Sequence, residues 1–130
     1  MAENPWDRVT VWHELMSLDP KRAKRFYEEV IGLTAVPLEG APFPYTLWLQ
    51  DGEPVGGLVP HQGKKKSWPS GQKPHWVSSF AVAEVDEAVK KAQKRGGEVL
   101  VPPTDIPQFG RAAVLKDPEG AIFGIFQKRK

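Results

Sequence analysis

Glu14 is the residue of this sequence whose position most strongly suggests chemistry. It lies two positions after Trp12, inside 9–17, a segment of β-branched and aromatic residues that has the length of a strand. A carboxylate removed from water there loses free energy unless it gains a partner. Glu14 is therefore predicted to bind a ligand, to transfer a proton, or to pair inside the protein, for instance with Arg111.

The roles open to Glu14 differ in the pKa that they require. Desolvation raises the pKa of a carboxyl group, and a nearby arginine lowers it. A raised pKa suits general acid/base catalysis on an α-hydroxycarbonyl compound or an enediol. A lowered pKa suits a fixed anion that orients a cationic or hydroxylated ligand. The sequence leaves both alternatives open.

Several other side chains could share a site with Glu14. Alternate residues of a strand face the same side, so Trp12 accompanies Glu14, and Ser79 accompanies His75 in a later strand. Trp12 suits core packing as well as a ligand, and a lone histidine at a strand end is often a surface residue. Aromatic side chains commonly line small-molecule sites, although each is equally at home in a core, and the candidates are Trp48, Phe126, Tyr45, Trp76, Phe109 and Phe123.

The elements that must position these residues follow from local patterns. After the strand over 9–17, Asp19-Pro20 is typical of a helix start, and apolar residues then recur with helical spacing up to Gly32. A short strand is possible in 33–39. The turn Asp51-Gly52 indicates a tight hairpin. Its strands are 45–50 and 53–60.

The second part of the chain repeats this order. The segment 61–74 has the composition of a linker and contains Trp68, a candidate lid or subunit contact. A strand over 76–82 and a helix over 84–95 are predicted next, followed by a strand over 98–101 that Pro102-Pro103 breaks. Two final strands, 111–115 and 121–126, pair across the turn between them.

The two parts also match residue by residue. A shift of 65 positions places Trp12 on Val77, and a shift of 66 places 49–53 on 115–119. We therefore predict an α+β fold made of two βαβββ repeats, whose curved mixed half-sheets enclose a shared cavity with the helices outside. The whole chain, 1–130, is expected to be one domain, with repeat 1 at about 8–60, the linker at 61–74 and repeat 2 at about 75–127.

Composition narrows the functional classes. With 40% hydrophobic and 26% charged residues, the chain is expected to be a folded globular protein. It has no apolar run of roughly 20 residues and no signal-peptide profile, which predicts a cytoplasmic protein with no membrane partner. The basic runs 64–66 and 128–130 are interpreted as solvated surface and not as a nucleic-acid site. Without cysteine, a metal site would need other ligands.

A set of short motifs in order resembles one branch of the vicinal oxygen chelate superfamily, which includes glyoxalases, bleomycin resistance proteins and dioxygenases. The resemblance runs from about residue 9 to 127. The motifs that carry it are Trp12-His13-Glu14-Leu15-Met16-Ser17-Leu18-Asp19 with Phe26-Tyr27, Gly56-Gly57-Leu58, Val101-Pro102-Pro103-Thr104-Asp105-Ile106-Pro107, Gly110-Arg111 and Asp117-Pro118-Glu119-Gly120.

The resemblance implies a site in which each half-sheet offers ligands to one divalent metal. The positions that carry His, Glu or Gln in metal-dependent relatives correspond here to Trp12, Gly57, Val77 and Gly124. None of these side chains binds a divalent cation. Metal-dependent glyoxalase or dioxygenase chemistry is therefore not expected, unless a register shift turned His13 inward with Glu14 and His75 beside it.

Two functions are consistent with this interpretation. The first is a metal-free protein that binds a small organic molecule in an aromatic-lined cavity; the predicted contacts are Trp12, Glu14, Trp48, His75, Ser79, Arg111 and Phe126. The second is a glyoxalase-type lyase or isomerase acting on a small α-oxygenated carbonyl compound. In it Glu14 is the general base and Arg111 or His75 its electrostatic partner. No other cofactor is predicted, and exposed strand edges favour a homodimer.

Overall fold

The computed structural model describes residues 4–39, 45–60, 74–106 and 108–128. By their internal contacts these residues form two compact units. We call residues 13–76 the first unit, and residues 1–12 together with 77–130 the second unit. Of the predicted linker over 61–74, residues 61–73, with Trp68 and the lysine run, lie outside the described residues. The shared cavity expected from the resemblance stays a prediction.

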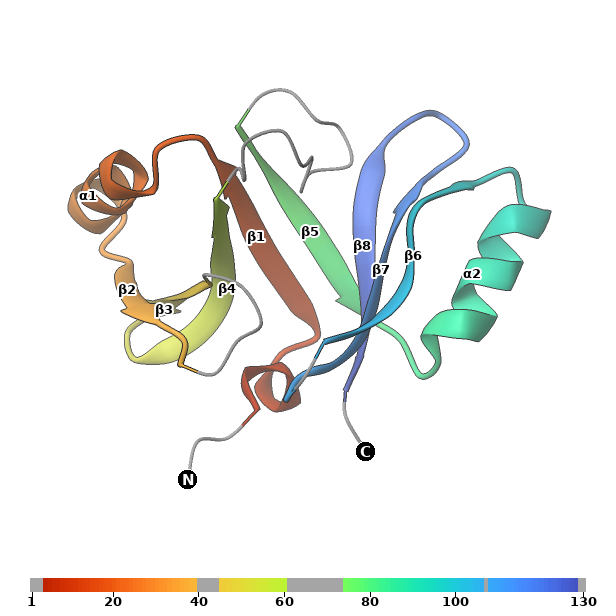
Figure 1. Cartoon of the computed structure of the whole chain (residues 1–130), viewed down its shortest axis with the longest axis horizontal. Helices are drawn as coiled ribbons and strands as arrows, with labels where there is room; N and C mark the ends of the chain where they lie inside the picture. Colours follow the sequence, from red (N-terminus) through yellow and green to blue (C-terminus); the bar gives the residue numbers. More distant parts are fainter. Residues whose placement is uncertain (1–3, 40–44, 61–73, 107, 129–130) are drawn as a thin grey trace. The chain divides into compact units, whose positions relative to one another are not determined.

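The two halves of the chain contain the same order of elements (Figure 1). The first half of the chain forms β1 (Val11–Ser17), α1 (Pro20–Val30), β2 (Thr34–Pro37), β3 (Thr46–Gln50) and β4 (Glu53–Pro60). The second half forms β5 (His75–Ala81), α2 (Val85–Lys94), β6 (Glu98–Ile106), β7 (Gly110–Lys116) and β8 (Ile122–Lys128). A short 3-10 helix, η1 (Pro5–Arg8), which the sequence did not predict, precedes β1.

Strand pairing confirms the two predicted βαβββ repeats. The order is β1-β4-β3-β2 in the first repeat and β5-β8-β7-β6 in the second. In each repeat the first strand runs parallel to the last, and the other neighbours are antiparallel. The register agrees at single-residue level: Glu14 pairs with Gly57, and Ser79 pairs with Gly124. Glu14 and Ser79 are 65 positions apart, the same offset that aligned the sequence.

Helix α1 begins and ends where the local signals predicted. The Asp19 side chain accepts a hydrogen bond from the backbone N–H of Arg22 at 3.2 Å, and Pro20 occupies the first helical position. Gly32 ends the helix with a φ of 87°, a left-handed conformation that favours glycine. Ala23 and Tyr27 pack against a core formed by Leu15, Leu33, Trp48 and Leu58.

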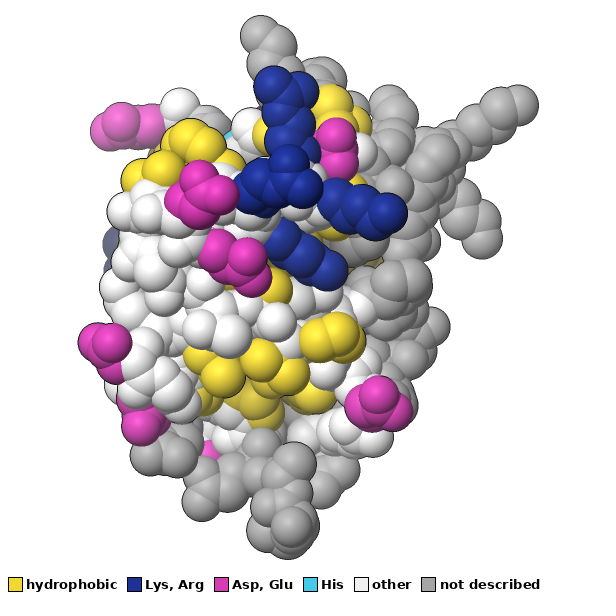
Figure 2. Space-filling model, turned by 90° about the vertical axis from the view of Figure 1, so that its left-hand side faces the viewer, with side chains coloured by type: hydrophobic (Ala, Val, Ile, Leu, Met, Phe, Trp, Pro, Cys, Tyr) yellow, Lys and Arg dark blue, Asp and Glu magenta, His cyan; other side chains and the backbone are white. Residues whose placement is uncertain are grey.

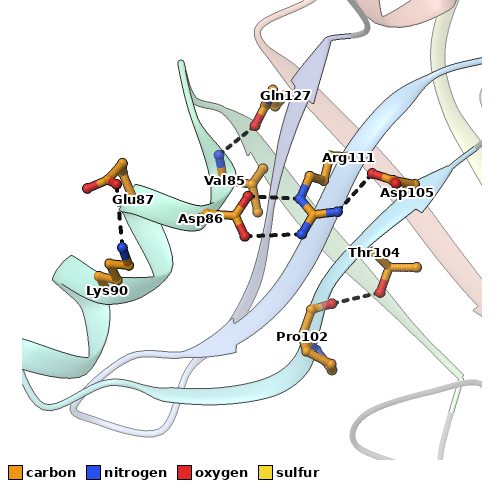
Figure 3. Close-up of polar contacts among 9 residues, drawn as sticks. All are labelled: Val85, Asp86, Glu87, Lys90, Pro102, Thr104, Asp105, Arg111 and Gln127. Carbon is orange, nitrogen blue, oxygen red and sulfur yellow. Dashed lines mark hydrogen bonds and ion pairs between the residues drawn. The ribbon is translucent and has the colours of Figure 1, made fainter.

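Helix α2 packs in the same way but has a different cap. Val85 and Val89 contact Ala113, Leu115 and Ile125 on β7 and β8. Glu84 precedes the helix without capping it, and Gln127 of β8 instead accepts a hydrogen bond from the backbone N–H of Val85 at 2.7 Å (Figure 3). Among the described residues, no helix has the length and apolar character that crossing a bilayer requires.

The sequence-based prediction for β6 was wrong. Pro102-Pro103 was expected to break this strand after Val101, but β6 continues to Ile106 and pairs with β7 along its length. The register shifts between Val99 and Val101 and again between Val101 and Thr104. Because β6 is an edge strand with β7 as its neighbour, the missing proline N–H groups can be accommodated at bulges or on the open side.

The cap on α2 gives a first prediction. Replacing Gln127 with Ala removes the acceptor for the Val85 N–H, and we expect the free energy of unfolding to fall by about 1 kcal/mol. The control Gln127→Glu keeps an acceptor oxygen near the positive end of the helix, and it should keep most of the stability. Urea denaturation measures both variants; equal losses would contradict a capping role.

Candidate functional site

The first unit has one face toward α1 and one away from it. Leu15, Trp48 and Leu58 point toward the helix, where they form the core with Ala23 and Tyr27. Because side chains alternate along a strand, Glu14 points to the opposite face, which we call the non-helix face. Gly57 of β4 is in register with Glu14, and Leu47 of β3 is in register with Gly57. Both therefore lie beside Glu14 on this face.

Glu14 is held on this face by a tyrosine. The Tyr45 hydroxyl donates a hydrogen bond to Oε2 of Glu14 at 2.6 Å. The Tyr45 side chain is 8% exposed, and Glu14 is half-buried. A hydrogen bond of this length to a carboxylate is a strong one, which fixes both side chains. An ionised carboxylate only accepts hydrogen bonds, at up to about four lone-pair sites, so the pair is suited to a ligand that donates one.

Gly57 makes room for the Tyr45 hydroxyl. A Cβ atom built on Gly57 would overlap the hydroxyl oxygen and the ring carbon that carries it. Any side chain at this position would therefore push Tyr45 away from Glu14. The phenol occupies the space into which a metal-binding side chain at position 57 would extend. The three residues thus form one arrangement: Gly57 leaves the space in which the Tyr45 hydroxyl lies, and from there the hydroxyl donates its hydrogen bond to Glu14.

A β-bulge brings Tyr45 to this face. The hairpin of β3 and β4 closes with Gln50 opposite Glu53, and its register then shifts between Trp48 and Leu49. After the shift Thr46 pairs with Leu58 on the helix side, so the preceding Tyr45 points to the non-helix face. Counting back from the Asp51-Gly52 turn without a bulge would have placed Tyr45 toward α1. Its aromatic character made Tyr45 a candidate for the site, but the sequence carried no signal for the bulge that brings it to Glu14.

The second unit contains the counterpart of this arrangement. Ser79 stands in register with Gly124, and a Cβ atom on Gly124 would overlap the Ser79 hydroxyl. Phe126 lies two residues further along β8 on the same face, where Trp6 covers it with ring centroids 4.7 Å apart. The Trp6 indole N–H is buried and has no hydrogen-bond partner among the described residues. Trp6, in η1, was not among the predicted residues.

Arg111 is not a partner of Glu14, contrary to the prediction. It points to the side of β7 that carries α2, where its Nε and one terminal nitrogen donate to the Asp86 carboxylate at 2.9 and 3.1 Å. The other terminal nitrogen donates to Asp105 at 2.8 Å (Figure 3). These hydrogen bonds raise the pKa of Arg111, and the hydrogen bonds from Arg111 lower the pKa of Asp86. Arg111 joins α2 to the sheet.

The other predicted site residues fall into two groups. Trp48 is 0% exposed in the core beneath α1, so it packs against the helix and lies on the face opposite to Glu14. His75 is half-buried at the start of β5, as the sequence predicted. Trp12 and Phe126 are buried, and Ser79 is half-buried. For His75, Trp12, Phe126 and Ser79 a ligand-binding role stays a prediction.

The residues at the family's metal positions do not fit a metal ion. Trp12 and Val77 are buried apolar side chains, and Gly57 and Gly124 have no side chain. The space beside each glycine is taken by the hydroxyl of Tyr45 or Ser79. Within the part of the chain that the structure describes, no group of three or more His, Asp or Glu side chains is arranged to hold an ion. His13, the alternative donor, is exposed.

The duplicated βαβββ order, with parallel first and last strands in each repeat, defines a protein of the vicinal oxygen chelate fold. The chain belongs to the Glyoxalase/Bleomycin resistance protein/Dioxygenase superfamily, whose sequence profile matches residues 10–125. This match confirms the relationship that the motifs indicated.

Three relatives illustrate how far the similarity extends. The chain is 40% identical over 120 residues to a protein of Mycobacterium tuberculosis named "Putative glyoxylase CFP32", and 32% identical over 126 residues to the anthracycline biosynthesis protein DnrV of Streptomyces peucetius. Each match covers 90% of this chain but only 43% and 46% of the relatives. The chain thus spans less than half the length of these curated relatives.

Solved structures confirm the fold. A methylmalonyl-CoA epimerase of Streptomyces coelicolor, in complex with 2-nitronate-propionyl-CoA, superimposes with a TM-score of 0.63. The superposition covers 94% of this chain and 99% of the epimerase, at 17% sequence identity. An identity this low supports a common fold and says nothing about a common reaction. Members of the superfamily do bind small-molecule ligands, as this complex illustrates.

The fit between Gly57 and Tyr45 gives a second prediction. Gly57→Ala should destabilise the protein by about 1–3 kcal/mol, because the added methyl group overpacks the site and displaces the tyrosine. In a Tyr45→Ala background the same change should cost much less. Urea denaturation of the four proteins in this double-mutant cycle measures the coupling. An equal loss in both backgrounds would show that Tyr45 does not fill the space beside Gly57.

Proposed function

We propose that this protein binds a small organic molecule at the non-helix face of the first repeat, with Glu14 and Tyr45 as the polar centre and without a metal ion. The observation that carries the proposal is the half-buried Glu14 carboxylate, held at 2.6 Å by the Tyr45 hydroxyl opposite a glycine. A carboxylate at this position contributes little to the stability of the fold, because it must be partly desolvated, and an apolar side chain in its place would not incur that cost. Ligand binding explains its presence.

The chemistry of this pair suggests which ligand it selects. The hydrogen bond runs from the Tyr45 hydroxyl to a carboxylate oxygen of Glu14, so the phenol is the donor of the pair. Both side chains can then accept further hydrogen bonds, and the carboxylate is negatively charged. Leu47 and Met16 surround them on the same face with apolar surface. A small, mainly apolar molecule that carries a hydroxyl or amino group fits this environment.

A catalytic function is the second candidate. In this alternative the protein is a glyoxalase-type lyase or isomerase that acts on a small α-oxygenated carbonyl compound, and Glu14 is its general base. The naming of CFP32 as a glyoxylase supports it. Tyr45 would hold the Glu14 carboxylate in one orientation, as a general base requires. With Arg111 bound to Asp86 and Asp105, His75 is the remaining candidate for an electrostatic partner.

A cytoplasmic location and a homodimeric state belong to the same proposal. The homodimer was inferred from the open edges of the half-sheets, and β2 and β6 are the edge strands of the two repeats. Nucleic-acid and membrane partners are not part of the proposal.

The role of Glu14 can be tested with a variant that keeps its shape. A thermal-shift screen would use hydroxyl-bearing and amine-bearing compounds, each paired with an analogue that lacks the donor group. Compounds that stabilise the protein should bind Glu14→Gln about tenfold to a hundredfold more weakly, because a hydrogen bond to a charged group is lost. Calorimetry measures the affinities.

The matched control is Glu119→Gln, which removes an exposed carboxylate from the turn before β8 and should leave every affinity unchanged. Unchanged affinity in Glu14→Gln as well would show that Glu14 is structural. Turnover of a bound compound by the original protein, lost in Glu14→Gln, would favour the catalytic alternative over simple binding.

Metal independence has its own test. Titration of the protein with nickel, zinc and iron(II), followed by calorimetry, should give no heat of stoichiometric binding, because Trp12, Gly57, Val77 and Gly124 offer no ligands. One-to-one binding would contradict the proposal. If such binding disappeared in His13→Ala or His75→Ala, it would identify a histidine site in place of the family's positions.

A further inference from the structure

Helix α1 exposes an apolar stripe. None of its residues is buried, and the side chains of Phe26 and Val30 are 55% and 62% exposed. These two residues are four positions apart and therefore lie next to each other on the same side of the helix. Leu18, just before the helix, is 58% exposed. By contrast, α2 buries both Val85 and Val89.

The charges of α1 are ordered against its own dipole. Four basic residues occupy its first half, and two acidic residues, Glu28 and Glu29, occupy its second half; the basic residues are Lys21, Arg22, Lys24 and Arg25. Positive charge near the N-terminus and negative charge near the C-terminus both disfavour a helix. Helix α2 has the opposite and favourable order, with acidic residues in its first turn and basic residues in its last. The charge order of α1 therefore does not serve its own stability.

These charges also make no ion pair within the described residues. Arg25 and Glu29 are four positions apart, as are Lys24 and Glu28, yet neither pair is within ion-pair distance, whereas Lys90 and Glu87 on α2 do form such a pair. Figure 2 faces the side of the molecule that carries α1, and there dark blue basic side chains lie next to magenta acidic ones, with yellow hydrophobic side chains alongside. The helix presents separated charges and an apolar stripe on one surface.

We propose that α1 is the contact surface for a second copy of this chain, with the two helices antiparallel about a two-fold axis at the level of position 27. A two-fold contact brings each residue to the same patch on the other copy. The basic half of one helix then lies beside the acidic half of the other, and Arg25 lies opposite Glu29. Phe26 and Val30 are removed from water in the centre, and the two helix dipoles oppose each other favourably.

The contact is small, which determines how it should behave. An eleven-residue helix is about 16 Å long, so this interface lies at the small end of protein interfaces and is expected to be weak. Dimers should therefore form with increasing protein concentration and dissociate on dilution. Because the charged residues are exposed, added salt should weaken the association. The non-helix face with Glu14 is not involved.

Charge exchange tests the proposal on the full chain by sedimentation equilibrium. R25E and E29R should each weaken the dimer about threefold to tenfold, because one substitution places like charges at two symmetric contacts. The double variant R25E/E29R restores opposite charges across the axis and should recover the association. A control on α2, K90E, should have no effect. Failure of the double variant to recover would contradict the antiparallel arrangement.

The apolar stripe is tested by a second pair of variants. F26A should abolish the dimer, whereas F80A, which removes another exposed phenylalanine, on β5, should leave it intact. Circular dichroism verifies that both variants fold. A chain that stays monomeric at the highest concentration, or a dimer that depends on Phe80 and not on Phe26, would overturn the proposal. Monomeric F26A should still bind the compounds found for Glu14, which keeps this test separate from the proposed function.

Discussion

The structure depends on two positions where the last strand of a repeat must have no side chain. Gly57 and Gly124 stand in register with Glu14 and Ser79, and a Cβ atom at either glycine would overlap a hydroxyl group. Parallel strands hold these pairs at a fixed separation, so neither residue can move away from the other. In each repeat the glycine therefore leaves a space where its Cβ atom would be, and the hydroxyl group of Tyr45 or Ser79 occupies that space.

The two repeats share a framework and differ in what it carries. The first holds a carboxylate and a phenol on its non-helix face, and the second holds a serine hydroxyl among buried aromatic rings. Their helices differ as well. Arg111 and Gln127 tie the start of α2 to the sheet, whereas α1 rests on Ala23 and Tyr27 and turns its charges outward. Duplication has preserved the backbone, and the two copies have taken separate roles on it.

Local sequence patterns predicted the helices, strands and turns well. They failed where contacts between residues far apart in the sequence determine the structure. The cap at Asp19, the stop at Gly32 and the Asp51-Gly52 turn each act within a few residues, and the structure has all three. The side-chain alternation around Glu14 was likewise predictable. The bulge after Trp48 was not, so the sequence named Trp48 and Tyr45 together as aromatic candidates and could not show that Tyr45, and not Trp48, lies beside Glu14. Arg111 was assigned to the wrong carboxylate because only tertiary packing brings Asp86 beside it.

The two helix caps imply an order in which the repeats can mature. The side chain that caps α1 is Asp19, three residues from the N–H that it binds, so this cap can close as soon as the segment leaves the ribosome. The cap of α2 is Gln127, which follows Val85 by 42 residues and lies on the last strand. Short loops close readily, and long ones must wait for tertiary structure to form. The second repeat can therefore complete the cap of its helix only when β8 has been synthesised and paired, whereas the cap of α1 can form while the rest of the chain is still being made.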